Sequence, residues 1–306
     1  MKQRILVIKL GALGDFILAM GPFKAIRHHH AGAHITLLTT PPYAELGHAC
    51  GYFDEILPIG RPAKRDLSGL WRLIRALRQG RFDRVYDLQT STRSSFYRYF
   101  IPGAEWSGIA RGCSHPHANP NRSRMHSRER QAEQLAMAGI DAVPPPDLSW
   151  GSADISHFNL PTSGYALLVP GGSAHRPEKR WPVEHYAELA FWLMEQGVRP
   201  LILGSGAEQE LAESIEARCP EALSLVDRTN FQEIITLARH AKLAIGNDTG
   251  PMHLIAAADG CPCLVLFSAA SDPARCAPRG ENVIILQRDP LASLSVGEVT
   301  SLADLH

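Results

Sequence analysis

The chain has 306 residues, 45% of them hydrophobic, and its 31 basic residues are balanced by 31 acidic ones. This length and composition suffice for two ordinary domains with their own cores, which excludes global disorder. A formal charge of zero gives no general attraction to nucleic acid, so we expect no nucleic-acid partner.

The cysteines and the amino terminus both indicate a cytoplasmic protein. The six cysteines form no Cys-x-x-Cys pair, and a chain of this size needs no disulfide crosslinks, so we expect reduced thiols. The first residues, MKQRILVIKLGALGD, turn to Gly and Asp after one short apolar run. That pattern fits neither a signal peptide nor a transmembrane helix.

The first half of the chain alternates between strand and helix. Apolar runs predict strands at 4–10, 34–39 and 55–58, and helical spacing predicts helices at 16–29 and 67–79. This alternation indicates a parallel sheet. The polar, basic and proline-broken stretch at 109–127 predicts a mobile loop, with a helix at about 128–139.

A second strand–loop–helix series begins at Tyr165, after three consecutive prolines within 141–150. Further strands are predicted at 200–203, 243–245, 263–267 and 283–286. We therefore expect two α/β domains, 1–150 and 151–306, each built on a parallel sheet.

The first candidate motif, Lys9-Leu-Gly11-Ala-Leu-Gly14-Asp15, leaves the first strand and enters the first helix. Ligands collect at the carboxyl ends of parallel strands, and glycines let them approach the backbone. Asp15 has two interpretations, a helix cap or a general base that takes a proton from an acceptor hydroxyl. Lys9 is either a nearby positive charge or a solvated strand end.

The second motif is Pro170-Gly-Gly-Ser173, followed by Lys179-Arg180-Trp-Pro. Exposed backbone N–H groups at Gly171 and Ser173, with two cationic side chains at the same rim, suit a diphosphate. The alternative is an ordinary glycine turn beside a surface Lys-Arg pair. The Trp-Pro pair is expected to fix the start of the next helix.

The third motif, Gly246-Asn-Asp-Thr-Gly-Pro-Met-His253, lies between a strand and an Ala-rich helix. Thr249, Gly250 and the helix start form a predicted phosphate site. Asp248 would repel phosphate, so it either faces hydroxyls or caps the helix. His253 either reaches the ligand or has a structural role.

A further strand-to-helix glycine turn carries Glu208, which could bind ribose hydroxyls, although the turn lacks the spacing of a dinucleotide fingerprint. The chain has no Asp-x-Asp pair, so lysine, arginine and backbone donors would meet the phosphate charge. The histidines at 28–30 and in the 109–127 region lack zinc-site spacing, and we expect no metal.

Five arginines form a local basic cluster in an otherwise neutral chain, and they indicate either a solvated surface or a site for an anionic acceptor. They are Arg111, Arg122, Arg124, Arg128 and Arg130.

Taken together, the motifs at 9–15, 170–182 and 247–253 resemble those of the ADP-heptose:lipopolysaccharide heptosyltransferases, glycosyltransferase family 9. His126-x-x-Glu129-Arg130 is also similar to that family. The resemblance spans both halves of the chain in the correct order. It implies a GT-B fold, with two Rossmann-like domains facing across a cleft, residues 1–150 holding the acceptor and 151–306 the donor.

The resemblance also implies inverting, metal-independent transfer of heptose from ADP-heptose to an anionic, lipid-linked inner-core saccharide. Asp15 would be the base, and Lys179, Arg180 and the Thr249-Gly250 turn would hold the diphosphate. Asp248 and His253 would contact donor hydroxyls or phosphate, and Glu208 the ribose. The implied acceptor-binding residues are Lys9, Gly11, Gly14, Arg122 and Arg124.

Such an enzyme would work at the inner face of the inner membrane through peripheral contact. One departure is Ser268-Ala-Ala-Ser271-Asp-Pro, where the family tends to have Gly-x-Thr-x-Pro. A transferase that uses another nucleotide sugar or acceptor therefore stays open as an alternative. A second alternative is a nucleotide-sugar-binding protein that has lost catalysis, and the intact Asp15 argues against it.

Overall fold

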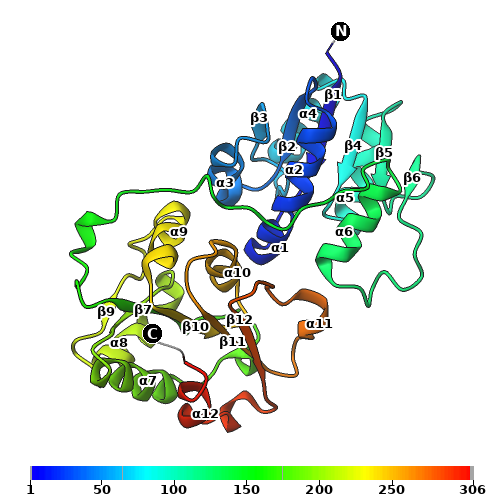
Figure 1. Ribbon diagram of the computed structural model, residues 1–306. Helices are drawn as coiled ribbons and strands as arrows, with labels where there is room; N and C mark the ends of the chain where they lie inside the picture. Colours follow the sequence, from blue (N-terminus) through cyan, green and yellow to red (C-terminus); the bar gives the residue numbers. More distant parts are fainter. Residues whose placement is uncertain (1, 64, 174, 304–306) are drawn as a thin grey trace. The chain divides into compact units, whose positions relative to one another are not determined.

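A computed structural model describes residues 2–63, 65–173 and 175–303 of the protein (Figure 1). The chain divides into two compact units, Met1–Trp150 and Gly151–His306. Each unit contains a six-stranded sheet whose neighbouring strands are all parallel. The expected α/β class is confirmed.

The N-terminal sheet has the strand order β3-β2-β1-β4-β5-β6. Its strands are β1 (Arg4–Ile8), β2 (His34–Leu38), β3 (Glu55–Leu57), β4 (Arg84–Asp87), β5 (Glu105–Gly108) and β6 (His115–Pro116). The helices of this unit are α1 (Leu13–Leu18), α2 (Met20–His29), α3 (Ala44–Ala49), α4 (Leu67–Gln79), α5 (Thr92–Phe96) and α6 (Ser127–Ala136), with 3₁₀ turns η1 (Pro41–Tyr43) and η2 (Tyr97–Phe100).

The C-terminal sheet repeats this topology in the order β12-β11-β10-β7-β8-β9. Its strands are β7 (Tyr165–Val169), β8 (Arg199–Ile202), β9 (Leu223–Ser224), β10 (Leu243–Asn247), β11 (Cys263–Phe267) and β12 (Val283–Gln287). The helices are α7 (Val183–Glu195), α8 (Gln209–Glu216), α9 (Phe231–His240), α10 (Gly250–Ala257), α11 (Pro273–Cys276) and α12 (Val296–Thr300), with 3₁₀ turns η3 (Ser156–Phe158), η4 (Pro177–Lys179), η5 (Gly206–Glu208) and η6 (Leu291–Ser293).

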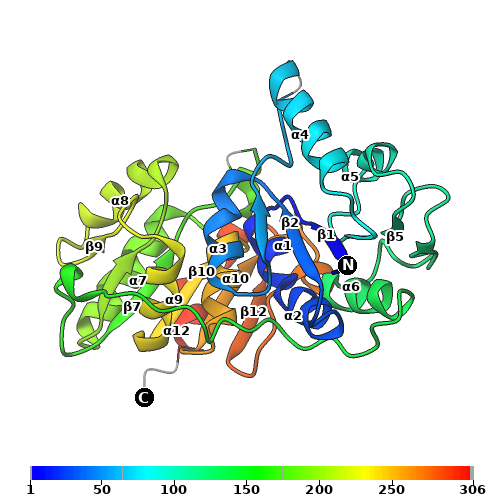
Figure 2. The same ribbon diagram turned by 90° about the horizontal axis from the view of Figure 1, so that it is seen from above.

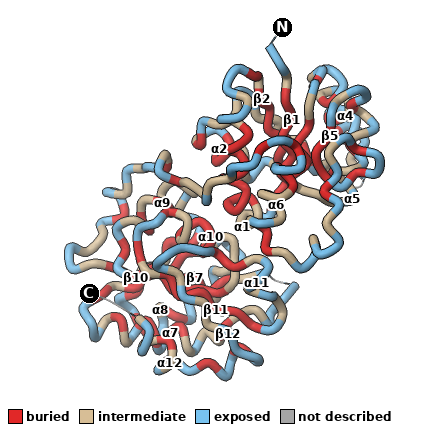
Figure 3. The backbone as a smooth tube through the Cα atoms, turned by 45° about the vertical axis from the view of Figure 1, so that its right-hand side comes forward, coloured by how far each residue is buried: buried red, intermediate tan, exposed pale blue. Residues whose placement is uncertain are grey.

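The central strands are buried on both faces, which explains their continuous apolar sequences (Figure 3). In the N-terminal unit, Leu73 and Leu77 of α4 pack against Leu6 and Ile8 of β1. In the C-terminal unit, the apolar faces of α7, α8 and α12 share one core with β7, β8, β10 and β11. Each unit is thus a sheet between layers of helices.

The N-terminal unit differs from the sequence prediction in three ways. The helix expected at 16–29 begins earlier and is two helices, because α1 ends at Leu18 and α2 starts at Met20. Strands β4 and β5 were not predicted, since neither has a long apolar run. The 109–127 region is not wholly irregular, because β6 within it pairs with β5.

The helix predicted at 67–79 is α4, with the same ends. No helix within the described part of the chain is long and apolar enough to cross a bilayer.

Candidate functional site

Each unit has one point at which the order of strands along the sheet reverses. In the N-terminal sheet this point lies between β1 and β4, and in the C-terminal sheet between β7 and β10. Open α/β sheets bind ligands outside the carboxyl ends of the strands at such points. The candidate motifs follow β1, β7 and β10, so they lie at these two positions.

The C-terminal unit has a cavity of about 510 Å³ at this point. It is lined by most of the residues expected to bind the donor, namely Gly171, Ser173, Lys179, Glu208, Asp248, Thr249 and Gly250. It also has an apolar part that the sequence did not reveal, formed by Leu203, Phe231 and Ile234. Asp227 and Thr229 add polar groups to the lining. One cavity therefore combines an apolar slot with charged and hydroxyl groups.

Lys179 and Asp248 form an ion pair within this lining. The Lys179 Nζ and Asp248 Oδ2 atoms are 2.6 Å apart, and the two side chains are only 14% and 8% exposed. The Ser271 hydroxyl also donates a hydrogen bond to Asp248 Oδ2. The segment that departs from the family pattern thus supplies a hydroxyl to a carboxylate of the cavity lining. Asp248 does not cap α10, so that alternative was wrong; the N-cap residue is Thr249.

The Thr249 side chain lies at the start of α10. Its Oγ1 atom is buried and has no hydrogen-bond partner among the residues that the structure describes. A buried hydroxyl without a partner destabilises a protein, so such a group indicates a ligand contact. The first N–H groups of α10 have no partner within the helix and can contribute to an anion site. Pro251 supplies no N–H group, so these donors come from its neighbours.

Glu208 is held in a capping box. Its Oε2 atom accepts hydrogen bonds from the Ser205 amide at 2.9 Å and from the Ser205 hydroxyl at 2.7 Å. A Cβ atom at Gly171 would lie 2.6 Å from Glu208 Cγ, so a glycine is required for this close approach. The glycine loop and the carboxylate therefore line the cavity together.

Two residues expected to bind the donor are not in the cavity lining. Arg180 donates from Nη2 to the Gly172 carbonyl oxygen at 2.6 Å, so it contacts the backbone of the glycine loop but does not line the cavity. His253 is buried within α10.

Asn247, the last residue of β10, connects three of the segments that line or support the cavity, and this role was not predicted from the sequence. Its Oδ1 atom accepts from the Trp181 amide at 3.0 Å, and its Nδ2 donates to the carbonyl oxygens of Pro170 and Gly171 at 2.8 and 3.0 Å. One buried side chain thus fixes the 170–173 loop against the 179–181 segment.

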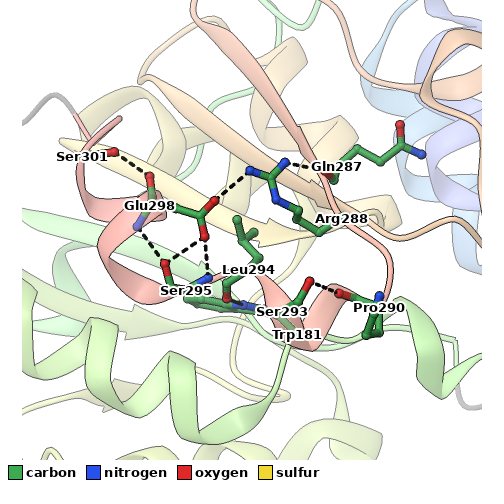
Figure 4. Close-up of polar contacts among 9 residues, drawn as sticks. All are labelled: Trp181, Gln287, Arg288, Pro290, Ser293, Leu294, Ser295, Glu298 and Ser301. Carbon is green, nitrogen blue, oxygen red and sulfur yellow. Dashed lines mark hydrogen bonds and ion pairs between the residues drawn. The ribbon is translucent and has the colours of Figure 1, made fainter.

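Trp181 anchors the segment that carries Lys179. Its indole Nε1 donates to the Leu294 carbonyl oxygen at 2.8 Å, and the side chain is buried (Figure 4). The following turn is itself held by a capping box between Ser295 and Glu298 and by a 2.7 Å Arg288–Glu298 contact (Figure 4). As expected, α7 starts directly after the Trp-Pro pair, at Val183.

In the N-terminal unit, the glycine loop after β1 is tightly packed. Gly11 has φ of +106°, and a Cβ atom there would lie 2.3 Å from Cε2 of Tyr43. Gly14 and Asp15 lie within the first turn of α1, whose N-cap residue is Ala12. The cap interpretation of Asp15 was therefore wrong. Its half-buried carboxylate is near enough to Lys9 for the two charges to interact.

Lys9 is buried, which contradicts its interpretation as a solvated strand end. Its side chain turns back into the unit, and Nζ donates to the Leu88 carbonyl oxygen at 3.3 Å. Burial lowers the pKa of Lys9, while the negative charges of Asp15 and Asp87 oppose that shift. The positive charges of Arg130 and Arg122 also act on Lys9 and add to the lowering of its pKa.

Asp87, the last residue of β4, is fully buried and was not predicted. Its Oδ1 atom accepts from the Thr90 amide at 2.9 Å, and Oδ2 has no hydrogen-bond partner within the described part of the chain. Burial raises the pKa of Asp87 from an ordinary 3.8 to about 6.

Arg122 belongs to this group through its hydrogen bonds. The Arg122 guanidinium donates to Thr90 Oγ1 at 2.5 Å and to His117 Nδ1 at 3.0 Å. Burial and the Arg122 charge lower the pKa of His117. Arg124 is exposed in the loop before α6. Lys9, Asp15, Asp87 and Arg122 thus form the N-terminal candidate site.

A metal site was not expected, and no group of three or more His, Cys, Asp or Glu side chains within residues 2–63, 65–173 and 175–303 could hold a metal ion.

Comparison with known proteins identifies the family. The profile described as glycosyltransferase family 9 (heptosyltransferase) matches residues 70–305. Among similar proteins, lipooligosaccharide heptosyltransferase 2 of Haemophilus ducreyi is 24% identical over 93% of this chain and 88% of its own length. Lipopolysaccharide heptosyltransferase 2 of Escherichia coli is 25% identical over 88% and 84%.

Solved structures share the fold. E. coli ADP-heptose lipopolysaccharide heptosyltransferase II aligns with a TM-score of 0.81 at 21% identity, over 99% of this chain and 97% of that one. E. coli heptosyltransferase WaaC with ADP aligns with a TM-score of 0.77 at 21% identity, over 98% of each chain. The expected GT-B fold class, with two Rossmann-like units, is confirmed. The chain is a glycosyltransferase, and it belongs to glycosyltransferase family 9, the heptosyltransferase family.

Proposed function

We propose that this protein transfers heptose from ADP-heptose to an anionic inner-core saccharide of lipopolysaccharide. The cavity of the C-terminal unit, called the donor cavity from here on, is the observation that carries the proposal. An apolar slot, a buried ion pair and a hydroxyl without a partner among the described residues meet in about 510 Å³. The names of the relatives support the donor and acceptor classes, because similar proteins act on lipopolysaccharide or lipooligosaccharide and a similar fold is described with bound ADP.

In this proposal each part of the nucleotide binds the part of the cavity lining that suits it chemically. The adenine ring occupies the apolar slot at Phe231 and Ile234, and the ribose hydroxyls donate to Glu208. The diphosphate lies against the Thr249-Gly250 turn, where the helix N-terminus and the Thr249 hydroxyl supply donors. Lys179, oriented by Asp248, neutralises charge that develops on the leaving ADP without a metal ion.

Asp248 contacts the hydroxyls of the donor sugar, because a carboxylate already paired with Lys179 still has acceptor capacity for them. The Ser271 hydroxyl holds this carboxylate in place. His253 is buried in α10 and does not line the cavity, so we assign it a structural role in that helix.

Asp15 is the proposed general base of the reaction. Its carboxylate takes the proton from the acceptor hydroxyl while that oxygen attacks the anomeric carbon, and the bond to ADP breaks with the electron pair leaving on the phosphate. Attack from the face opposite ADP inverts the anomeric centre. Lys9 lies near enough to Asp15 for the two charges to interact. Lys9, Gly11, Gly14 and Arg122 form the acceptor site, with Arg124 at its exposed rim.

An assay of ADP release tests this proposal. Purified protein receives ADP-heptose, or another nucleotide sugar, with or without a deacylated inner-core acceptor. We expect release that depends on both ADP-heptose and acceptor. Faster release from another nucleotide sugar would favour the alternative donor. Tight ADP binding without release from any donor would favour a binding protein.

A further inference from the structure

The first turns of α4 expose large apolar side chains to solvent. Leu67 is 76% exposed and Trp71 60%, and Leu70 is also exposed. Residues three and four positions apart lie on one face of a helix, so these three side chains form a continuous surface, the α4 patch. Exposed apolar patches of this kind mark interaction sites.

The α4 patch is not needed to hold the helix in the fold. Leu73 and Leu77, farther along α4, are fully buried in the core of the N-terminal unit and anchor the helix there. Figure 2 shows α4 projecting from the periphery of this unit. On α5, close to the loop before α4, Phe96 is also 52% exposed.

The surroundings of the patch are strongly basic in a chain whose net charge is zero. The exposed arginines before and on α4 are Arg61, Arg65, Arg72, Arg75 and Arg78. The guanidinium carbon of Arg75 lies 5.3 Å from the ring centroid of Trp71, so cationic and apolar groups adjoin directly.

Asp66 is the only acidic residue in the stretch from 61 to 81, and it caps α4. Its Oδ1 atom accepts from the Gly69 amide at 2.7 Å. The positive charge around the patch is therefore not compensated by acidic residues of the same segment.

The patch lies at the edge of the sheet that carries the proposed acceptor site. Residues of the first turns of α4, Gly69 and Arg72, line a small cavity together with Pro41 and Pro58, which follow the carboxyl ends of β2 and β3. Arg93 of α5 donates to the Pro62 carbonyl oxygen at 3.0 Å and fastens α5 to the same loop. Asp15 follows β1 at this edge of the sheet.

We propose that the α4 patch docks the N-terminal unit on an anionic lipid bilayer, with Leu67 and Trp71 inserted among the acyl chains and the arginines bound to the headgroups. Tryptophan and arginine side chains suit this boundary, since each combines an apolar body with a polar end. Anionic headgroups attract each nearby arginine. Docking itself does not depend on the proposed function. The proposed function supplies only the biological reason for docking, which is to bring the active site to a lipid-linked acceptor.

A second copy of this chain is a poorer occupant of the patch. A twofold contact through it would bring the same arginines of both copies together, and like charges that face each other oppose association. A bilayer with anionic headgroups supplies the opposite charge.

Vesicle flotation of the full chain tests the proposal. The lipids are phosphatidylethanolamine with phosphatidylglycerol, and vesicles of phosphatidylcholine alone serve as the neutral comparison. The test variant carries Leu67→Ser and Trp71→Ser. Phe191→Ser on α7 is the matched control, because Phe191 is 57% exposed in the other unit. Thermal melting of each variant checks that it is folded.

We expect the unchanged protein to bind the anionic vesicles and the Phe191→Ser control to bind them equally well. The affinity of the double variant should be lower by a factor of about ten or more. Added salt and the Arg72→Gln/Arg75→Gln variant should both weaken binding. Equal binding by the double variant, or equal binding to phosphatidylcholine, would overturn the proposal. So would a dimer in velocity sedimentation that the double variant dissociates.

A second readout separates this inference from the proposed function. With a deacylated, water-soluble acceptor, the double variant should release ADP as fast as the unchanged protein, and it should be slower only with a lipid-linked acceptor in vesicles. Vesicle binding that depends on Trp71 in a protein that releases no ADP would support docking and contradict the transferase function.

Discussion

Lys179 and Asp248 form an ion pair of 2.6 Å across 69 positions of the sequence, and it joins two of the segments that line the proposed donor cavity. The pair is largely buried, so removing either partner leaves an uncompensated charge in the interior. The pair therefore has a structural role besides any contact with a ligand.

These two roles are separable by a double-mutant cycle. We expect Lys179→Met and Asp248→Asn each to lower the free energy of unfolding by about 3 kcal/mol, and the double variant to lose clearly less than the sum. ADP binding, measured by calorimetry, should stay weak in the double variant because Lys179 is absent. Additive losses in urea unfolding would show that the pair is not coupled.

Thr249→Val is expected to raise stability and weaken ADP binding together. The substitution keeps the shape of the side chain and removes a buried hydroxyl that has no partner among the described residues, so the free energy of unfolding should rise by about 1 kcal/mol. ADP affinity should fall about tenfold, because the hydroxyl no longer donates to phosphate. Unchanged affinity would remove Thr249 from the proposed phosphate site.

Glu208→Gln tests the ribose contact. Glutamine also completes a capping box with Ser205, so stability should change little, while the loss of charge weakens the hydrogen bonds from ribose hydroxyls. We expect about tenfold weaker binding of ADP and no effect on its 2′,3′-dideoxy analogue. An equal effect on both nucleotides would place the carboxylate elsewhere.

Many residues of the proposed donor site could be predicted from the sequence, because they directly follow buried strands. The residues Gly171, Asp248 and Thr249 come after apolar runs that can only be central strands, and the carboxyl ends of parallel strands meet at one edge. Phe231 and Ile234 were not predictable, since they reach the cavity from α9, whose place in space depends on the whole unit.

The N-terminal site was harder to predict from the sequence. The four residues of β4 begin with a charged residue and end with one, which hides the strand and its buried Asp87. The environment of Lys9 is set by Leu88, 79 positions away, and by Asp87, so a single strand end gives no sign of burial. Asp15 was expected at the amino terminus of a helix that begins at residue 16, and it lies within the first turn of α1 because this helix starts earlier, at Leu13.

The buried Asp87 should give stability a pH dependence of its own. A carboxyl group whose pKa is higher in the folded state binds more protons there than in the unfolded chain, so its contribution falls as pH rises from about 4 to about 6 and is constant above. This change is about 3 kcal/mol. Relative to Asp87→Asn, the unchanged protein should lose stability over that interval in urea unfolding. A constant difference between pH 4 and pH 7 would contradict the burial of an ionisable group there.

Mass spectrometry of the acceptor tests the central claim most directly. A deacylated inner-core saccharide is incubated with ADP-heptose and either the unchanged protein or Asp15→Asn, whose folding is checked by thermal melting. We expect the unchanged protein to yield an acceptor one heptose heavier and the variant to yield almost none, because an amide at position 15 cannot accept the hydroxyl proton. An acceptor of unchanged mass with the unchanged protein would contradict heptose transfer, and equal product from the variant would contradict Asp15 as the base.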